Sequence, residues 1–283
     1  MISKDKKILI IGLGLIGGSY AEGLTKAGYH VEAITRSQSS IDYALKKGII
    51  SGGTIEVKEE YVKQFDILIF SLYPHVFVEW LKNYQNFIKP GAILTDATGI
   101  KRWIIEQIDS FIRDDIEFVS AHPMAGKEVY GVVNADSNIF KGANYIICPT
   151  EKSTKEAVEV VKNIGEVLEF KHISILSPDE HDEMIGFLSQ LTHCIAVSLM
   201  TSKSSEYLVD YTGDSFRDLT RIAKINEDMW TELFILNKDK LLNEMNNFIA
   251  HFEELKEALE NEDREKMKEI MRLSTERRKF FDR

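Results

Sequence analysis

The amino-acid sequence predicts an α/β fold class, with an N-terminal Rossmann-like doubly wound sheet followed by an all-α C-terminal domain. Through residue 174, short apolar and β-branched runs alternate with stretches of helical period. Strands separated by helices pair in parallel through right-handed crossovers, with both faces of the sheet covered. Beyond Ser177 and Pro178 no strand pattern follows, and apolar residues recur at intervals of three and four. We therefore expect a sheet domain over residues 1–174 and a helical domain over residues 175–283.

Each predicted element follows from its local pattern. Seven apolar runs are predicted strands: residues 7–11, 30–35, 65–71, 92–96, 117–121, 144–148 and 172–176. Four stretches between them are predicted helices: residues 16–27, 40–47, 76–87 and 155–168. Ser177, Pro178 and Glu180 predict a helix start, with Ser as the cap, Pro at the first helical position and Glu completing a capping box. The apolar series from Leu241 to Leu259 predicts one long amphipathic helix.

The composition excludes several classes of protein. The chain has 283 residues, is 44% hydrophobic and contains two cysteines, which excludes disordered, collagen-like and disulfide-stapled proteins. Its net charge of −10 disfavours nucleic acid and anionic membrane surfaces as partners. The longest apolar run, residues 8–18, is too short to span a bilayer. Cys148 and Cys194 form no spaced metal motif and fit a reducing compartment, so we expect a cytoplasmic protein without a metal.

A glycine-rich turn follows the first predicted strand and opens the first predicted helix. Its first glycine permits a tight turn, its second allows backbone to approach a pyrophosphate, and its third allows close helix–strand packing. The helix N-terminus offers unpaired N–H groups to the anion. The alternative is a glycine-rich turn without a ligand, but the strand–turn–helix context favours dinucleotide binding. The turn consists of Gly12, Leu13, Gly14, Leu15, Ile16 and Gly17.

The end of the second predicted strand indicates which dinucleotide binds. An NAD site usually places a carboxylate there for the ribose 2′-hydroxyl, but this strand ends in Thr35, Arg36 and Ser37. Glu32 lies earlier in the strand and is expected to point elsewhere. An arginine can pair with a 2′-phosphate, and the two hydroxyls can donate hydrogen bonds to it. The sequence thus favours NADP, with NAD possible, unless Arg36 is merely a surface cation.

Three further strand ends carry candidate site residues, because ligands gather at the carboxyl ends of strands in open α/β sheets. After the third predicted strand, Ser71, Leu72 and Tyr73 form a loop typical of the segment beneath a nicotinamide. The fourth predicted strand ends in residues 95–101, which include Thr98. After the fifth, His122 stands at the strand edge, fixed by Pro123. A histidine there is suited to accept a hydroxyl proton during hydride transfer, although a lone histidine is as often structural.

Four separated motifs together resemble the prephenate/arogenate dehydrogenase family of tyrosine biosynthesis. The segment from Ala121 to Gly126 is similar to the family's A-H-P-x-x-G signature, and the segment ending in His193 resembles its helical histidine. The remaining two are Asp218-Leu219-Thr220-Arg221-Ile222-Ala223, which resembles D-x-T-R-I-A, and Asp228-Met229-Trp230, which fits the family's M-W pair. The resemblance covers nearly the whole chain.

The resemblance implies an oxidative decarboxylation of prephenate to 4-hydroxyphenylpyruvate, with hydride transfer to NAD(P)+. It implies that His122 draws off the proton of the 4-hydroxyl and that Arg221 pairs with a substrate carboxylate. The substrate-binding residues it implies in all are His193, Arg221, Arg217, Thr98, Trp230 and Glu128, with Trp230 walling the pocket and Glu128 gating access. Each has a plainer interpretation: Arg217 as a solvated cation, Trp230 as core and His193 as a buried structural histidine.

The chain departs from the family at Gly99, where a Ser that contacts the hydroxyl and the catalytic histidine is common. We expect Thr98 to supply this hydroxyl if the loop shifts. His181 receives no role, and the segment from Asp179 to Glu183 is interpreted as an exposed helix start rather than a metal site.

Rival functions are of two kinds. Arogenate dehydrogenase performs the same chemistry on a substrate with an amine in place of the side-chain keto group, and a general β-hydroxyacid or imine reductase is less favoured. A non-catalytic dinucleotide sensor would bind cofactor without turnover, but His122, Arg221 and His193 together argue against it. Because helical domains of this kind expose apolar stripes, we expect a homodimer through the helical domain.

Overall fold

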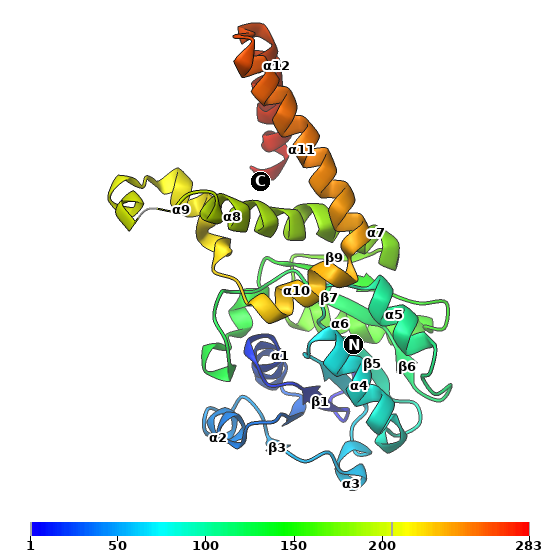
Figure 1. The fold of residues 1–283 in the computed structure, drawn as a ribbon. Helices are drawn as coiled ribbons and strands as arrows, with labels where there is room; N and C mark the ends of the chain where they lie inside the picture. The colour runs from blue at the N-terminus through cyan, green and yellow to red at the C-terminus, as the bar shows by residue number, and fades with distance from the viewer. Residues whose placement is uncertain (1, 205, 283) are drawn as a thin grey trace. The chain divides into compact units, whose positions relative to one another are not determined.

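The structure, a computed structural model, describes residues 2–204 and 206–282 (Figure 1). Six strands form a parallel sheet in the order β3-β2-β1-β4-β5-β6, which confirms the Rossmann-like class. The strands are β1 (Lys7–Ile11), β2 (His30–Ile34), β3 (Gly52–Thr54), β4 (Ile67–Phe70), β5 (Ile93–Asp96) and β6 (Glu117–Phe118). The sequence pattern missed β3, because its Gly-Gly-Thr sequence carries no apolar alternation.

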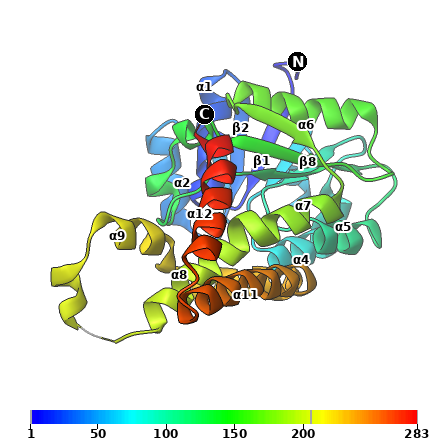
Figure 2. The ribbon, with the colours of Figure 1, turned by 90° about the horizontal axis from the view of Figure 1, so that it is seen from above.

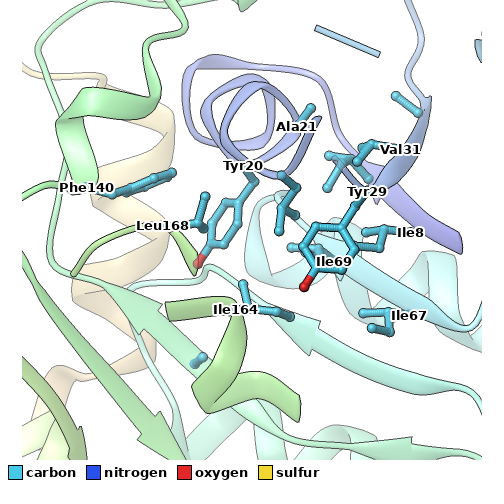
Figure 3. Packing of buried hydrophobic residues seen from close by; sticks show 14 of the residues in the cluster. Ile8, Tyr20, Ala21, Tyr29, Val31, Ile67, Ile69, Phe140, Ile164 and Leu168 are labelled. Atoms are coloured by element: carbon cyan, nitrogen blue, oxygen red, sulfur yellow. The ribbon is translucent and has the colours of Figure 1, made fainter. Parts of the chain in front are cut away.

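Helices cover both faces of this sheet, as the near-continuous apolar strands require. Alternate residues of β1 enter two separate cores: Ile8 and Ile10 pack beneath α1, α2 and α6, whereas Leu9 and Ile11 pack beneath α4 and α5. Figure 3 shows Tyr20 of α1 among the residues of the first core, and Figure 2 shows the helices on the two sides of the strands. The helices are α1 (Leu15–Lys26), α2 (Gln38–Lys46), α3 (Glu59–Val62), α4 (Pro74–Tyr84), α5 (Arg102–Asp109) and α6 (Lys155–Val167).

A second sheet corrects the expectation of a single doubly wound sheet. Its order is β7-β8-β9, formed by β7 (Ser120–Pro123), β8 (Asn144–Cys148) and β9 (His172–Ile175), and β7 pairs with β8 antiparallel. The strand expected over residues 117–121 is therefore divided between two sheets. The chain returns from β7 to β8 through loops and short 3-10 turns rather than a crossover helix, so the two strands run in opposite directions.

In the described part of the chain, all regular elements after β9 are helical, as predicted. These are α7 (Pro178–Ile185), a π-helical segment (Gly186–Leu191), α8 (Thr192–Thr201), α9 (Asp214–Thr220), α10 (Glu227–Leu236), α11 (Lys238–Glu260) and α12 (Arg264–Arg278). Helix α11 is the long amphipathic helix expected from the Leu241–Leu259 series, and α7 begins with the predicted capping box of Ser177 and Glu180. Short 3-10 turns lie at Gln85–Phe87, Val132–Asn134, Ser137–Phe140, Glu206–Tyr211, Arg221–Ala223 and Lys279–Phe281.

By their internal contacts, the residues form two compact units, Met1–Asn237 and Lys238–Arg283. Helices α7 to α10 thus belong to the same unit as both sheets, and the second unit consists of α11, α12 and the terminal 3-10 turn. A domain boundary between residues 174 and 175 stays a prediction.

The run Pro178–Thr201 is long and apolar enough to cross a membrane, by length and composition alone. One of its buried polar residues, Asp182, has partners at the start of α5. The buried Asp182 carboxylate accepts hydrogen bonds from the backbone N–H groups of Lys101 and Arg102, at 2.8 and 2.9 Å. These bonds fix α7 against the start of α5.

Candidate active site

The glycine turn after β1 has the geometry that dinucleotide binding requires. Gly12 adopts a φ of +97°, and a Cβ there would lie 2.3 Å from the Ser71 carbonyl oxygen. A Cβ on Gly17 would lie 2.0 Å from the Gly12 carbonyl oxygen. Gly14 faces open space and precedes α1 without any side-chain cap. The turn therefore leaves the first N–H groups of α1 free for a pyrophosphate, and the residues fit a dinucleotide.

At the end of β2, Arg36 is exposed and Thr35 half-buried, and the Ser37 hydroxyl accepts the Ser40 N–H at 3.2 Å as the cap of α2. Glu32 lies inside the strand. Its carboxylate accepts a hydrogen bond from the Tyr61 hydroxyl at 2.5 Å and contacts His30 at 2.7 Å. Glu32 is thus engaged away from the strand tip, as the sequence indicated.

The loop after β4 contacts both the glycine turn and the start of α10. The Ser71 N–H donates to the Ile11 carbonyl at 2.8 Å, and this places the loop against the glycine turn. The hydroxyl of Tyr73 accepts a hydrogen bond from Asn226 at 2.9 Å, just before α10. Glu232 of α10 in turn accepts the His75 N–H at 2.8 Å, at the start of α4. Two side chains from the helical segment thereby hold the loop for which the sequence predicts a position beneath a nicotinamide.

His122 lies on β7 and makes a hydrogen bond that the sequence did not predict. Its Nδ1 lies 2.9 Å from Nε2 of His181 on α7, and the Nδ1 of His181 lies 2.7 Å from the Asp182 carboxylate. His181 and Asp182 are fully buried. The interpretation of this helix start as exposed was therefore wrong for these two residues, because α7 turns this face onto the β5–α5 loop. Their separation from His122 by 59 residues hid the cluster from sequence reasoning.

Burial and nearby charge hold both imidazoles neutral. The pKa of His122 is well below its ordinary value, chiefly because the ring is desolvated and further because His181 and Lys101 oppose a positive charge. Burial also lowers the pKa of His181, although its hydrogen bond to Asp182 acts in the opposite direction. At neutral pH His122 is therefore unprotonated, which is the form that a general base needs.

A buried ion pair lies beneath His122. The Lys101 ammonium donates to the Asp96 carboxylate at 2.8 Å and to the Ala121 carbonyl at 2.5 Å, and both charged side chains are fully buried. The other carboxylate oxygen of Asp96 accepts from the Ser120 hydroxyl at 2.6 Å and from the Ala121 N–H at 3.1 Å. This pair fixes the start of β7 to the end of β5, and sequence reasoning assigned neither residue a role.

The structure corrects the expectation for Thr98. Its hydroxyl lies within the buried network: it donates to the Asp96 carboxylate, accepts from the Lys101 ammonium at 3.2 Å, and the residue is 4% exposed. In this arrangement the Thr98 hydroxyl does not take the place of the missing serine hydroxyl, because it is hydrogen-bonded to the buried Asp96 carboxylate. Gly99 is the residue beside the catalytic candidate: a Cβ there would lie 3.9 Å from Cε1 of His122 and 3.6 Å from Leu233 of α10.

The helical segment brings four of the predicted substrate residues together. His193 stacks on Trp230, with ring centroids 3.7 Å apart, and donates from Nδ1 to the Ser189 carbonyl at 2.9 Å. Arg221 pairs with Glu128 at 2.5 Å, and both charges act on the pKa of His193, which burial lowers. Because Leu233 lies one turn after Trp230, helix α10 joins this group to the Gly99–His122 side.

Arg217 is not drawn into this group. Its guanidinium pairs with Asp214 at 2.5 Å and donates to the Thr212 carbonyl at 3.1 Å, within its own segment. Helix α9 ends at Thr220, so Arg221 begins a separate 3-10 turn rather than continuing the helical face of Arg217. A substrate role for Arg217 stays a prediction.

Two family models match consecutive parts of the chain, and the second begins just after β9 ends. The description "prephenate dehydrogenase, nucleotide-binding domain" matches residues 20–174, and "prephenate dehydrogenase, dimerization domain" matches residues 177–273. The chain belongs to the prephenate dehydrogenase family. The resemblance drawn from the sequence motifs is therefore confirmed.

Relatives within the prephenate dehydrogenase family match over most of the chain. The prephenate dehydrogenase of Lactococcus lactis is 36% identical over 88% of this chain and 70% of its own length. That of Bacillus subtilis is 31% identical, over 92% of this chain and 72% of its own. Among solved structures, prephenate dehydrogenase from Aquifex aeolicus in complex with hydroxyphenyl propionate and NAD+ is 28% identical, with a TM-score of 0.90 and full coverage of both chains.

Proposed function

We propose that this protein is a prephenate dehydrogenase that converts prephenate to 4-hydroxyphenylpyruvate by oxidative decarboxylation. The observation that carries this proposal is the placement of His122, neutral and half-buried on β7 and hydrogen-bonded through Nδ1 to His181. Family membership supplies the class of substrate.

His122 moves one proton in this reaction. A bound nicotinamide supplies a hydride acceptor for the carbon that carries the 4-hydroxyl. As the hydride leaves, His122 takes the hydroxyl proton at Nε2, and the O–H electron pair forms the carbonyl. When the ring carboxylate departs as CO2, the electrons of its C–C bond pass through the ring to that oxygen, which recovers the proton from His122. Protons therefore balance without net release.

The carboxylates of prephenate require cationic and hydrogen-bonding partners. Arg221 supplies a planar guanidinium for bidentate pairing, and Glu128 occupies that guanidinium in this structure. A substrate carboxylate would replace Glu128, which would then act as a gate. The His193–Trp230 stack forms a rigid wall beside it.

We assign NADP as the preferred cofactor, with NAD as the alternative. Arg36 is exposed at the strand tip, and Glu32 is engaged with Tyr61 and His30. Arg36→Ala is expected to raise the Kd for NADPH about 10-fold or more while the Kd for NADH changes less than about threefold, because a charge-assisted hydrogen bond contributes roughly 1.5–3 kcal/mol. Fluorescence titration of both reduced cofactors measures this. Lys46→Ala, at an exposed lysine of α2, is the matched control. A wild-type protein that clearly prefers NADH would make the Arg36 assignment wrong.

We further propose that the protein works in the cytoplasm as a homodimer through its helical domain. The match to a dimerization domain supports the dimer, and the exposed apolar residues of α11, including Phe248, Ile249 and Phe252, are consistent with it.

The function is tested by steady-state assay of prephenate and arogenate, each with NADP+ and NAD+. We expect turnover of prephenate, seen as reduced cofactor and CO2. Turnover of arogenate alone would replace the substrate assignment, and cofactor binding without turnover of either would indicate a dinucleotide sensor.

A further inference from the structure

The hydrogen-bond chain behind His122 runs through His181 and ends on the carboxylate of Asp182. The Asp182 carboxylate accepts hydrogen bonds from the backbone N–H groups of Lys101 and Arg102, at 2.8 and 2.9 Å. Both oxygens of this carboxylate therefore accept hydrogen bonds from N–H groups. An ionised carboxylate only accepts hydrogen bonds, so the proton between it and His181, 2.7 Å away, must reside on Nδ1 of His181.

The tautomer of His181 then decides that of His122. Because His181 is buried and neutral, a proton on its Nδ1 leaves its Nε2 without one. This bare Nε2 faces Nδ1 of His122 at 2.9 Å, and two bare nitrogens would repel each other. His122 therefore carries its proton on Nδ1, and its Nε2 has a free lone pair.

We propose that His181, held by Asp182, is a positioning residue that fixes His122 in the Nδ1–H tautomer, so that Nε2 is the atom that receives the substrate's hydroxyl proton. Within residues 2–204 and 206–282, no hydrogen bond engages Nε2 of His122. The groups that bear on His122 are His181 and Asp182 of α7 and the Asp96–Lys101 pair beneath β7. As His122 gains the proton, its Nδ1–H still donates to His181, and the Asp182 charge stabilises the resulting cation.

The role of this series of hydrogen bonds in turnover rests on the proposed function, but the tautomer of His122 does not. The first test is therefore spectroscopic. In protein labelled with 15N-histidine, long-range 1H–15N correlations are expected to show His122 protonated at Nδ1 and bare at Nε2. The opposite tautomer in the wild-type protein would overturn the inference, whatever the enzyme does.

The second test compares two replacements of His181. Leucine removes both hydrogen bonds, so His122 is free to place its proton on Nε2, and kcat should fall roughly 100-fold or more while KM for prephenate changes little. Glutamine can accept from His122 through Oε1 and donate to Asp182 through Nε2, and it should keep kcat within about tenfold of the wild type. His172→Leu, at an exposed histidine of β9, is the control.

The outcomes are distinguishable. Equal kcat losses in His181→Leu and His181→Gln, or an unchanged kcat in His181→Leu, would contradict a positioning role. If the leucine variant fails to fold, the kcat of the glutamine variant and the tautomer of His122 in the wild type still test the positioning role of His181. Absence of prephenate turnover in the wild type would reject the proposed function and leave the spectroscopic result standing.

Discussion

Replacing His122 with asparagine is expected to lower kcat for prephenate about 10²–10⁴-fold, the usual contribution of a general base. Asparagine retains a side-chain hydrogen bond near His181, but it cannot accept the hydroxyl proton as the hydride leaves. His122 lies on β7, whereas the glycine turn proposed to bind the dinucleotide follows β1. The Kd for reduced cofactor should therefore stay within about twofold. Steady-state kinetics and fluorescence titration give the two quantities.

A matched variant tests whether the loss is specific to this position. His172→Asn replaces an exposed histidine of β9 on the same sheet, and its kcat should equal that of the wild type. Turnover by His122→Asn within tenfold of the wild type would reject His122 as the base.

Lys101→Met is expected to lower the free energy of unfolding by about 3–5 kcal/mol, the usual cost of removing one partner of a buried ion pair. Asp96 would keep a carboxylate in the interior with no cation beside it, and the Ala121 carbonyl would lose its 2.5 Å hydrogen bond. Urea unfolding followed by circular dichroism measures the change. The start of β7 should also loosen, so kcat should fall as well.

The control is a more exposed lysine with the same chemistry. Lys89 pairs with Asp66 at 2.7 Å, but its side chain is 34% exposed, so Lys89→Met should cost no more than about 1 kcal/mol. In the double variant Asp96→Asn/Lys101→Met, part of the lost stability should return. A loss below 1 kcal/mol in Lys101→Met would show that Asp96 is not left as an uncompensated charge.

Sequence reasoning recovered those features of the fold that are encoded locally. The strand–turn–helix at Gly12 and the capping box at Ser177 each lie within a few residues, and their patterns are set by backbone sterics and by unpaired N–H groups. The division of the fifth predicted strand between two sheets was not visible. It depends on Asp96, which lies on another strand and accepts hydrogen bonds from the Ser120 hydroxyl and the Ala121 N–H.

The same distinction holds at the candidate site. Thr98 was expected to face the pocket because it is a hydroxyl next to Gly99, but the buried Asp96 binds that hydroxyl. His181 was set aside because its neighbours looked like a solvated helix start, yet α7 buries it against His122. No local signal distinguished a capped, acidic helix start in solvent from one packed on a loop.

The sequence by itself determined the fold class and the glycine turn, because the patterns of neighbouring residues predict both. It also indicated the family and His122 as the candidate base, because four separated motifs resemble that family. Only the tertiary structure decided what stands behind His122: a buried histidine and carboxylate on α7 and a buried ion pair beneath β7. Hydrogen bonds between residues far apart in the chain set tautomers and hold charges in the interior. The fold has to form before such partners are defined.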